Sequence, residues 1–263
     1  MKEKERFQRP PGAPQPEVPF VPFLLLTASL IIVPTPIAIS LSAYRALYSS
    51  IHANPTFCEM GFGPHFPARQ PAWSDEETRR WIQECDIAKS WMERGMGDFA
   101  VGIIPTGGRE EAPMNEAGRL LGDGSQGIRI VEKEDYLKLV GNDHQFLHDV
   151  QWVGYAGVRD ATTTSMPNQK PEDPELPPWQ EMIELRYGVT PEYWGEGYAR
   201  AAAEAIMQWA ASERDVKRFI AETERENMRS GRVLAKLGFH LNGTNYWKEP
   251  SEIEWERVSK GMI

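Results

Sequence analysis

A glycine-containing turn between a strand and a helix constrains this 263-residue chain more than any other feature. Residues 182–189 have the apolar character of a strand, and the alanine-rich segment 199–211 is typical of a helix. Gly195 and Gly197 lie between them. Glycine lets the backbone bend tightly, and the free amides at the start of a helix attract anions. The pattern predicts a phosphate or pyrophosphate site, and an ordinary strand-to-helix turn is the alternative.

Two motifs further along the chain decide between these interpretations. Glu226-Asn227-Met228-Arg229-Ser230 follows the turn after about thirty residues, and Lys236-Leu237-Gly238-Phe239 comes next. Together with Gly195-Glu196-Gly197-Tyr198-Ala199 they resemble the GNAT acetyltransferase superfamily. The resemblance points especially to the branch of ribosomal-protein N-terminal acetyltransferases and their many uncharacterised fungal relatives. It is strong over residues 181–247, and a weaker part extends back to about residue 24.

The resemblance implies an α/β (α+β) fold of the GNAT type. A mixed, mostly antiparallel central sheet would splay after the fourth strand and be flanked by helices. The periodicity agrees with this fold, because apolar runs at 24–34, 97–104, 150–158, 182–189, 218–223 and 239–247 predict strands. We expect a flexible N-terminal leader at 1–20, a GNAT domain at 21–250 with an insertion at about 106–148, and a C-terminal tail at 251–263.

The resemblance also implies that acetyl-CoA is the cosubstrate. The pantetheine arm would pair with main-chain groups of the strand that ends at Val189, and the pyrophosphate would lie against the glycine turn. Asn227 matches a family asparagine that contacts the cofactor, and a simple helix cap is its alternative role. The expected cofactor-binding residues are Tyr187, Gly188, Val189, Trp194, Gly195, Glu196, Gly197, Tyr198, Ala199 and Asn227.

The candidate catalytic residues are Glu181, Glu184 and Ser230. Glu181 aligns with the glutamate that serves as base in histone-type members, and Glu184 with an acid common in the ribosomal branch. Because these glutamates are three residues apart, at most one can point into a cleft from an ideal strand. Ser230 is a substitute for the family's proton-donating tyrosine, whose position holds Leu234 here. For each candidate, a solvated or capping role is the alternative.

The expected function is therefore an acetyl-CoA-dependent N-acetyltransferase in which a primary amine attacks the thioester directly. A protein N-terminus, a lysine and a small amine are all open as acceptors. The alternative is a non-catalytic acetyl-CoA or CoA-binding module with a regulatory or assembly role. Leu234, and Glu192 where a polar or basic group is usual, keep this alternative open. The family's acceptor wall corresponds to Phe57, Glu59, Phe62, Phe66 and Trp73.

Composition narrows the partners further. A net charge of −9 argues against sequence-independent binding of nucleic acid. The apolar stretch at 23–33 is shorter than the ~20 residues of a membrane span. Cys58 and Cys85 show no metal or disulfide spacing, so we expect buried free thiols, no metal and a cytoplasmic location. The chain is expected to be a monomer or a homodimer.

Overall fold

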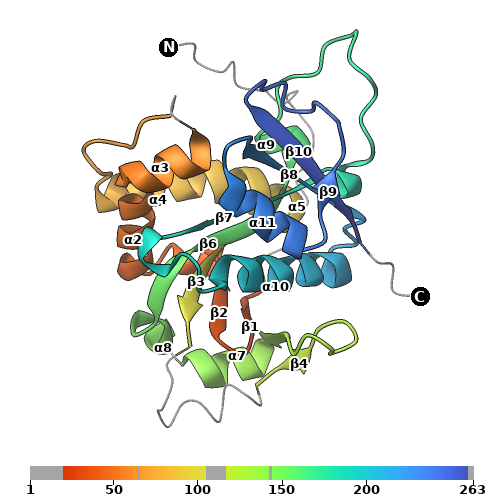
Figure 1. Ribbon diagram of the computed structural model, residues 1–263. Coiled ribbons are helices and arrows are strands. Elements are labelled where there is room, and N and C mark those ends of the chain that lie inside the picture. The colour runs from red at the N-terminus through yellow and green to blue at the C-terminus, as the bar shows by residue number, and fades with distance from the viewer. Residues whose placement is uncertain (1–19, 64–65, 105–116, 142–143, 260–263) are drawn as a thin grey trace, which may run out of the picture.

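A ten-stranded mixed sheet runs through the residues that the computed structural model describes, 20–63, 66–104, 117–141 and 144–259 (Figure 1). The strand order is β4-β5-β1-β2-β3-β6-β7-β8-β10-β9. Among the described residues, all neighbouring strands pair in antiparallel fashion except β7 and β8, which are parallel. The bounds are β1 Phe23–Leu26, β2 Leu30–Pro34, β3 Asp98–Ile103, β4 Arg119–Leu120, β5 Arg129–Glu132, β6 Gln151–Asp160, β7 Ile183–Val189, β8 Arg218–Glu224, β9 His240–Leu241 and β10 Glu252–Val258.

Helices cover both faces of the central strands. The side chain of Tyr187 reaches Ser230 of α11, whereas a Cβ on Gly188 would meet Phe57 of α3. Adjacent strand residues point to opposite faces, so α11 and α3 lie on opposite sides of β7. The helical segments are α1 Thr35–Ala38, α2 Ser42–Ala53, α3 Pro55–Phe62, α4 Asp75–Ile82, the π-helix Gln83–Trp91, α5 Met92–Arg94, α7 Lys133–Val140, α8 Gln145–His148, α9 Ala161–Thr164, the 3-10 turns Trp179–Glu181 and Pro191–Tyr193, α10 Tyr198–Glu213 and α11 Met228–Lys236.

The sheet splays between β7 and β8. These strands pair in register only at Ile183↔Phe219 and Glu184↔Ile220. Beyond Glu184 the described residues of the two strands no longer pair, although β7 continues to Val189 and pairs with β6 along its whole length. Since β7 is the fourth strand predicted from the sequence, the expected GNAT-type sheet that splays after the fourth strand is confirmed.

Local sequence signals set the ends of the helices that flank the cleft. Ser74 caps α4 through a capping box with Glu77. Asn54 caps α3, and Pro55 takes the first helical position, where a missing N–H is harmless.

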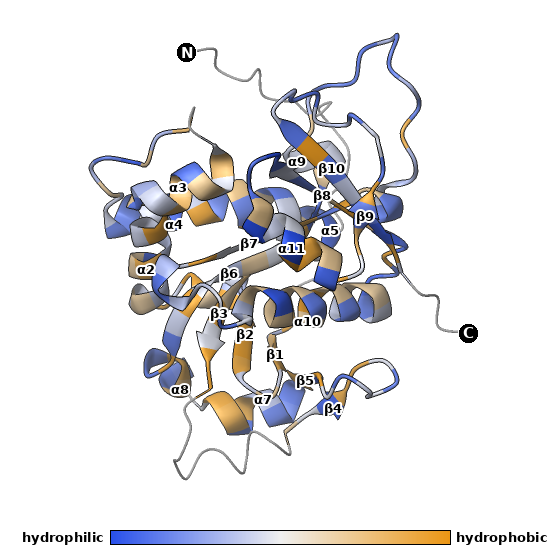
Figure 2. Ribbon diagram, in the orientation of Figure 1, coloured by the Kyte–Doolittle hydropathy of each residue, from blue (hydrophilic) through white to orange (hydrophobic). Residues whose placement is uncertain are grey.

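The strands β1 and β2 are entirely buried and form an apolar centre beneath α10 (Figure 2). No helix among the described residues has the length and apolar character needed to cross a membrane.

Three expectations about the strands and the C-terminal segment are wrong. Residues 251–263 are not simply a tail, because Glu252–Val258 forms β10 and pairs with all of β8. The predicted strand 239–247 shrinks to the two residues of β9. The run 24–34 is a hairpin of two strands that turns where Thr27 N donates to Leu30 O. Charged residues at alternate positions of β10 concealed the strand, because they do not give the apolar pattern of a buried strand.

The expected insertion at 106–148 is partly a continuation of the sheet. Its strand β5 pairs with β1 over four residues, which extends the sheet at the edge opposite β9. Residues 105–116 and 142–143, like most of the expected leader at 1–20, lie outside the described residues. Cys58 is a buried free thiol as expected, whereas Cys85 is half-buried.

We predict that Gly154→Ala destabilises the fold and disturbs the splayed end of β7. A Cβ at this position would lie 2.1 Å from the Gly188 carbonyl oxygen, a backbone atom that cannot rotate away. Overpacking of this kind costs about 1–3 kcal/mol. Thermal unfolding measures the loss, and Gly61→Ala in α3 is the control because nothing lies within 4 Å of its added Cβ. Equal melting temperatures for Gly154→Ala and the wild type would contradict the prediction.

Candidate functional site

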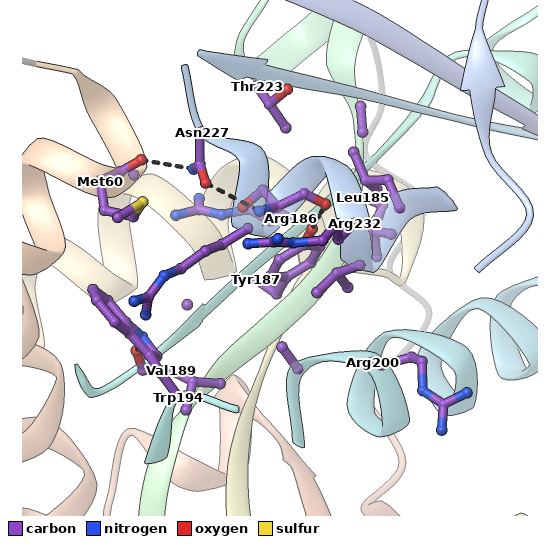
Figure 3. Close-up of a pocket in the computed structure, with 18 of the residues that line it drawn as sticks. Met60, Leu185, Arg186, Tyr187, Val189, Trp194, Arg200, Thr223, Asn227 and Arg232 are labelled. Atoms are coloured by element: carbon purple, nitrogen blue, oxygen red, sulfur yellow. Dashed lines mark hydrogen bonds between the residues drawn. The ribbon is translucent and has the colours of Figure 1, made fainter. Parts of the chain in front are cut away.

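A cleft of about 760 Å³ opens where β7 and β8 diverge (Figure 3). Its walls come from β7, β8, the loop that leads into α10, α11 and the end of α3. Two residues predicted from the sequence, Glu181 and Glu196, are not among those that line it. The predicted residues that the fold does bring to the cleft are Glu184, Tyr187, Gly188, Val189, Trp194, Gly195, Gly197, Tyr198, Ala199, Asn227 and Ser230.

The glycine turn has the conformation that the sequence predicts. Gly195 and Gly197 have φ angles of 95° and 85°, a left-handed region that side chains rarely adopt. No atom lies within 4 Å of a Cβ built on either residue, so this stretch of backbone faces open space. Gly197 is the N-cap of α10 and provides no side-chain cap. The first-turn amides of α10 therefore remain suited to an anion.

Basic side chains gather near this turn. Arg229, Arg232 and Lys236 come from α11 and Arg200 from α10, and all four line the cleft. Their spacing of three and four residues along α11 places them on one side of that helix, a signal that the sequence analysis missed. The Arg229 guanidinium lies 4.8 Å from the centroid of the Trp194 ring. This side of the cleft is suited to a ligand with several phosphate groups.

Two side chains hold the parts of the cleft together. The Trp194 indole Nε1 donates to the Val189 carbonyl at 2.7 Å, which fixes the loop against the end of β7. Asn227 Oδ1 accepts from the Ser230 amide at 3.0 Å, and Asn227 Nδ2 donates to the Met60 carbonyl at 2.6 Å (Figure 3). Asn227 is therefore both a helix cap and a link between α11 and α3.

The three candidate catalytic residues differ in position. Glu184 lies at the apex of the cleft, 5% exposed, with its carboxylate bound by Arg159 Nε at 2.9 Å and Arg159 Nη2 at 3.1 Å. The Ser165 hydroxyl also donates to it. Glu181 belongs to a 3-10 turn before β7 and lies outside the cleft lining. Ser230 lines the cleft, and its carbonyl accepts from the Tyr187 hydroxyl at 3.2 Å.

These contacts make Glu184 a weak candidate for a base. Burial opposes its ionisation, but the charge of Arg159 and the hydrogen bonds from Arg159 and Ser165 hold the pKa of Glu184 below its usual range. The carboxylate is thus ionised with both oxygens already bound. Arg159 was not among the predicted site residues, because nothing in the sequence places β6 beside β7.

A second cavity of about 730 Å³ lies on the α2–α4 side of β7 and shares Phe62, Phe66, Arg159 and Arg186 with the first. Of the expected acceptor wall, Phe57, Phe62 and Phe66 line the first cavity and Trp73 lines the second, whereas Glu59 lines neither.

The second cavity contains a buried charge network. Arg186 Nη1 lies 3.5 Å from Asp98 Oδ2. The Asp98 carboxylate can take this position because Gly157 has no side chain. A Cβ on Gly157 would lie 2.3 Å from Asp98 Oδ1. Asp86 accepts from the Asp98 amide at 2.9 Å and from the Thr35 hydroxyl. Burial and the nearby Asp98 charge raise the pKa of Asp86 to about 7.

Comparison with known proteins agrees with this geometry. Residues 140–240 match the family model described as "Acetyltransferase (GNAT) domain". These residues form a GNAT acetyltransferase domain. The superfamily resemblance drawn from the motifs is thereby confirmed. The match contains β6, β7, α10, β8 and α11, the elements that build the cleft.

Sequence relatives match only part of this chain. An uncharacterized N-acetyltransferase of Bacillus subtilis, YjdG, is 38% identical over 61 residues, which cover 23% of this chain and 36% of the relative. The other two curated relatives are covered over 46% and 45% of their length, so the chain spans less than half of each.

Solved structures support the fold. An acetyltransferase from Agrobacterium tumefaciens aligns with a TM-score of 0.51 and 18% identity, covering 98% of this chain and 99% of that one. The apo structure of RimL, a ribosomal L7/L12 alpha-N-protein acetyltransferase, aligns with a TM-score of 0.50 and 14% identity over 91% of this chain and 95% of its own.

We predict that Asp86→Asn stabilises the protein more at pH 8 than at pH 5. The folded-state pKa of about 7 exceeds the ordinary 3.8, so the wild type loses stability as the pH rises through this window. Asparagine carries no charge and removes that loss, a relative gain on the order of 2 kcal/mol between the two pH values.

Thermal unfolding at the two pH values measures this effect. Glu84→Gln on the same π-helix is the control, because Glu84 is exposed and its charge stays in water. A difference between Asp86→Asn and wild type that does not grow with pH would contradict the prediction.

Proposed function

We propose that this protein transfers the acetyl group of acetyl-CoA to a primary amine by direct attack of the amine on the thioester. The observation that carries the proposal is the cleft at the splay, which combines the glycine turn of α10 with the free side of β7 inside a GNAT domain. The proposed acceptor is a protein N-terminus, a lysine or a small amine. The cytoplasm is the proposed location, because the buried thiol of Cys58 fits a reducing compartment.

The unpaired part of β7 suits the pantetheine arm. After Glu184 the strand pairs with no described residue of β8. Its main-chain groups on that side can therefore form hydrogen bonds with an extended chain, as they would with a neighbouring strand. Residues Tyr187 to Val189 are the proposed partners. The pyrophosphate would then lie at the loop 194–199 and the start of α10, with Arg200 and the basic residues of α11 around it.

The proposed chemistry needs a neutral amine and a stabilised oxyanion. A backbone amide at the end of β7, such as that of Val189, is suited to the developing negative charge because it is fixed in place before reaction. Glu184 holds Arg159 at the apex of the cleft, and Ser230 lies on the α11 side. We propose that Glu184 and Ser230 lie beside the reacting groups, and that Glu181 has a structural role away from them.

A second candidate is a CoA-binding module without turnover. One observation favours it: Leu234, at the position where the family resemblance implies a proton-donating tyrosine, is completely buried. Such a module would bind acetyl-CoA in the same cleft but release no free thiol.

We predict that acetyl-CoA binds with measurable heat in calorimetry and that an amine or peptide panel releases free CoA thiol from it. Thiol release is measured with a disulfide reagent, and the acetylated product by mass spectrometry. Binding without thiol release for any amine favours the module. Absence of binding contradicts both candidates.

We predict that Gly197→Trp weakens acetyl-CoA binding at least 100-fold. The indole would occupy the open space where the backbone approaches the phosphates, and the position already has a φ of 85°. The matched control is Gly127→Trp, which has a φ of 65° and equally open surroundings but lies outside the cleft lining. Equal affinity of the Gly197→Trp variant and the wild type would refute the placement of the pyrophosphate.

A further inference from the structure

Two glutamates that the proposed function does not use meet beside the apex of the cleft. Glu222 lies on β8, two residues beyond Ile220, which forms the last pair with β7. Glu254 of β10 is its direct partner, so Glu252 is its diagonal neighbour on the same face. Glu222 and Glu252 both line the cleft, whereas Glu254 does not.

The neighbouring carboxylates accept hydrogen bonds from other side chains or amides, whereas one oxygen of each glutamate in this pair has no donor among the described residues. Glu254 accepts from the Thr244 hydroxyl and the Trp247 amide, while Glu184 accepts from Arg159 and Ser165. In contrast, the Oε2 atoms of Glu222 and Glu252 are buried and receive no hydrogen bond from any other described residue. An unsatisfied carboxylate oxygen away from water is costly, so the two groups must share a proton or meet a ligand.

The charges that face Glu222 come from several elements. Glu184 of β7 and Glu252 of β10 add negative charge, and Arg159 of β6 partly offsets it. The residues that α3 itself contributes to the cleft lining, Phe57, Met60, Gly61 and Phe62, are uncharged. Burial, the hydrogen bond with Glu252 and the charges of Glu184 and Glu252 raise the pKa of Glu222 to about 10. Glu222 is therefore protonated at neutral pH, and the Glu252 carboxyl group lies beside it on the neighbouring strand.

We propose that Glu222 and Glu252 form the proton-transfer pair of the acetyl transfer. Glu252 accepts the proton that the amine nitrogen loses as it bonds to the carbonyl carbon. Glu222 gives its proton to the CoA sulfur as the C–S bond breaks. One N–C bond forms, one C–S bond breaks, and the pair ends the cycle with the single proton that it held at the start, so no further reactant is needed.

The proposal rests on the proposed acetyl transfer and assigns a proton donor that the sequence left open. Leu234 lines the cleft as a completely buried residue, but its aliphatic side chain cannot donate a proton. Glu184 is ionised and bound to Arg159, which makes it unsuitable as an acid. A carboxyl group held protonated at the divergence of β7 and β8 can serve as general acid in place of a tyrosine.

The test compares Glu222→Gln and Glu252→Gln with the wild type in steady-state kinetics and acetyl-CoA calorimetry. For Glu222→Gln we expect kcat to fall about 100-fold, the usual scale of general acid catalysis, with the Kd for acetyl-CoA within twofold of wild type. We expect the wild-type kcat to decline above about pH 10, where Glu222 loses its proton, and this decline to be absent from the residual activity of Glu222→Gln. Glu252→Gln should likewise lower kcat rather than raise the KM for the amine.

Controls separate this inference from the proposed function and from misfolding. Glu249→Gln removes a nearby charge outside the cleft and should keep wild-type kinetics. Both cleft variants should melt no lower than wild type, because each removes a carboxyl group whose buried Oε2 atom has no hydrogen-bond donor among the described residues. An inactive wild type refutes the proposed function itself. An active wild type whose Glu222→Gln variant keeps its kcat, or changes only the KM for the amine, refutes the proton-transfer pair.

Discussion

The short parallel pairing of β7 with β8 is the constraint on which the rest of the site depends. Two residue pairs join these strands, and after Glu184 the strands separate. Their separation leaves one side of β7 without a neighbour and creates the cleft between them. It also brings the start of α10 and the basic side of α11 to one wall and α3 to the other (Figure 1). Longer pairing would close the space in which a cosubstrate could lie.

Charged residues on the α3 side of the sheet are arranged so that most of them are neutralised in pairs. Arg159 binds Glu184, and Arg186 reaches Asp98 over the bare backbone of Gly157. Burying these charges is costly, and pairing with close hydrogen bonds offsets the cost. Glu222 and Glu252 form no ion pair with a described residue, and the Oε2 atom of each is buried without a hydrogen-bond donor there. A site that must move one proton per cycle can use such a pair.

The motifs near the glycine turn allowed a large part of the site to be predicted. Gly195, Gly197 and Asn227 act through local backbone geometry, and local geometry is readable in a sequence. Glu252 was missed because β10 alternates charged and apolar residues and was interpreted as a tail. Arg159 was missed because its importance arises only from its contact with Glu184, which lies on another strand. The choice between Glu181 and Glu184 required knowing where β7 begins.

By itself, the sequence determined the strand–turn–helix unit, its glycine conformations and the family that they indicate. These properties depend on residues close together along the chain, whose conformations are limited by their own side chains. Only the tertiary structure decided which carboxylates are bound, which face the cleft, and that the chain after residue 251 completes the sheet beside β8. Those properties depend on strand register and burial, because a carboxyl group's protonation is set by neighbours distant in sequence.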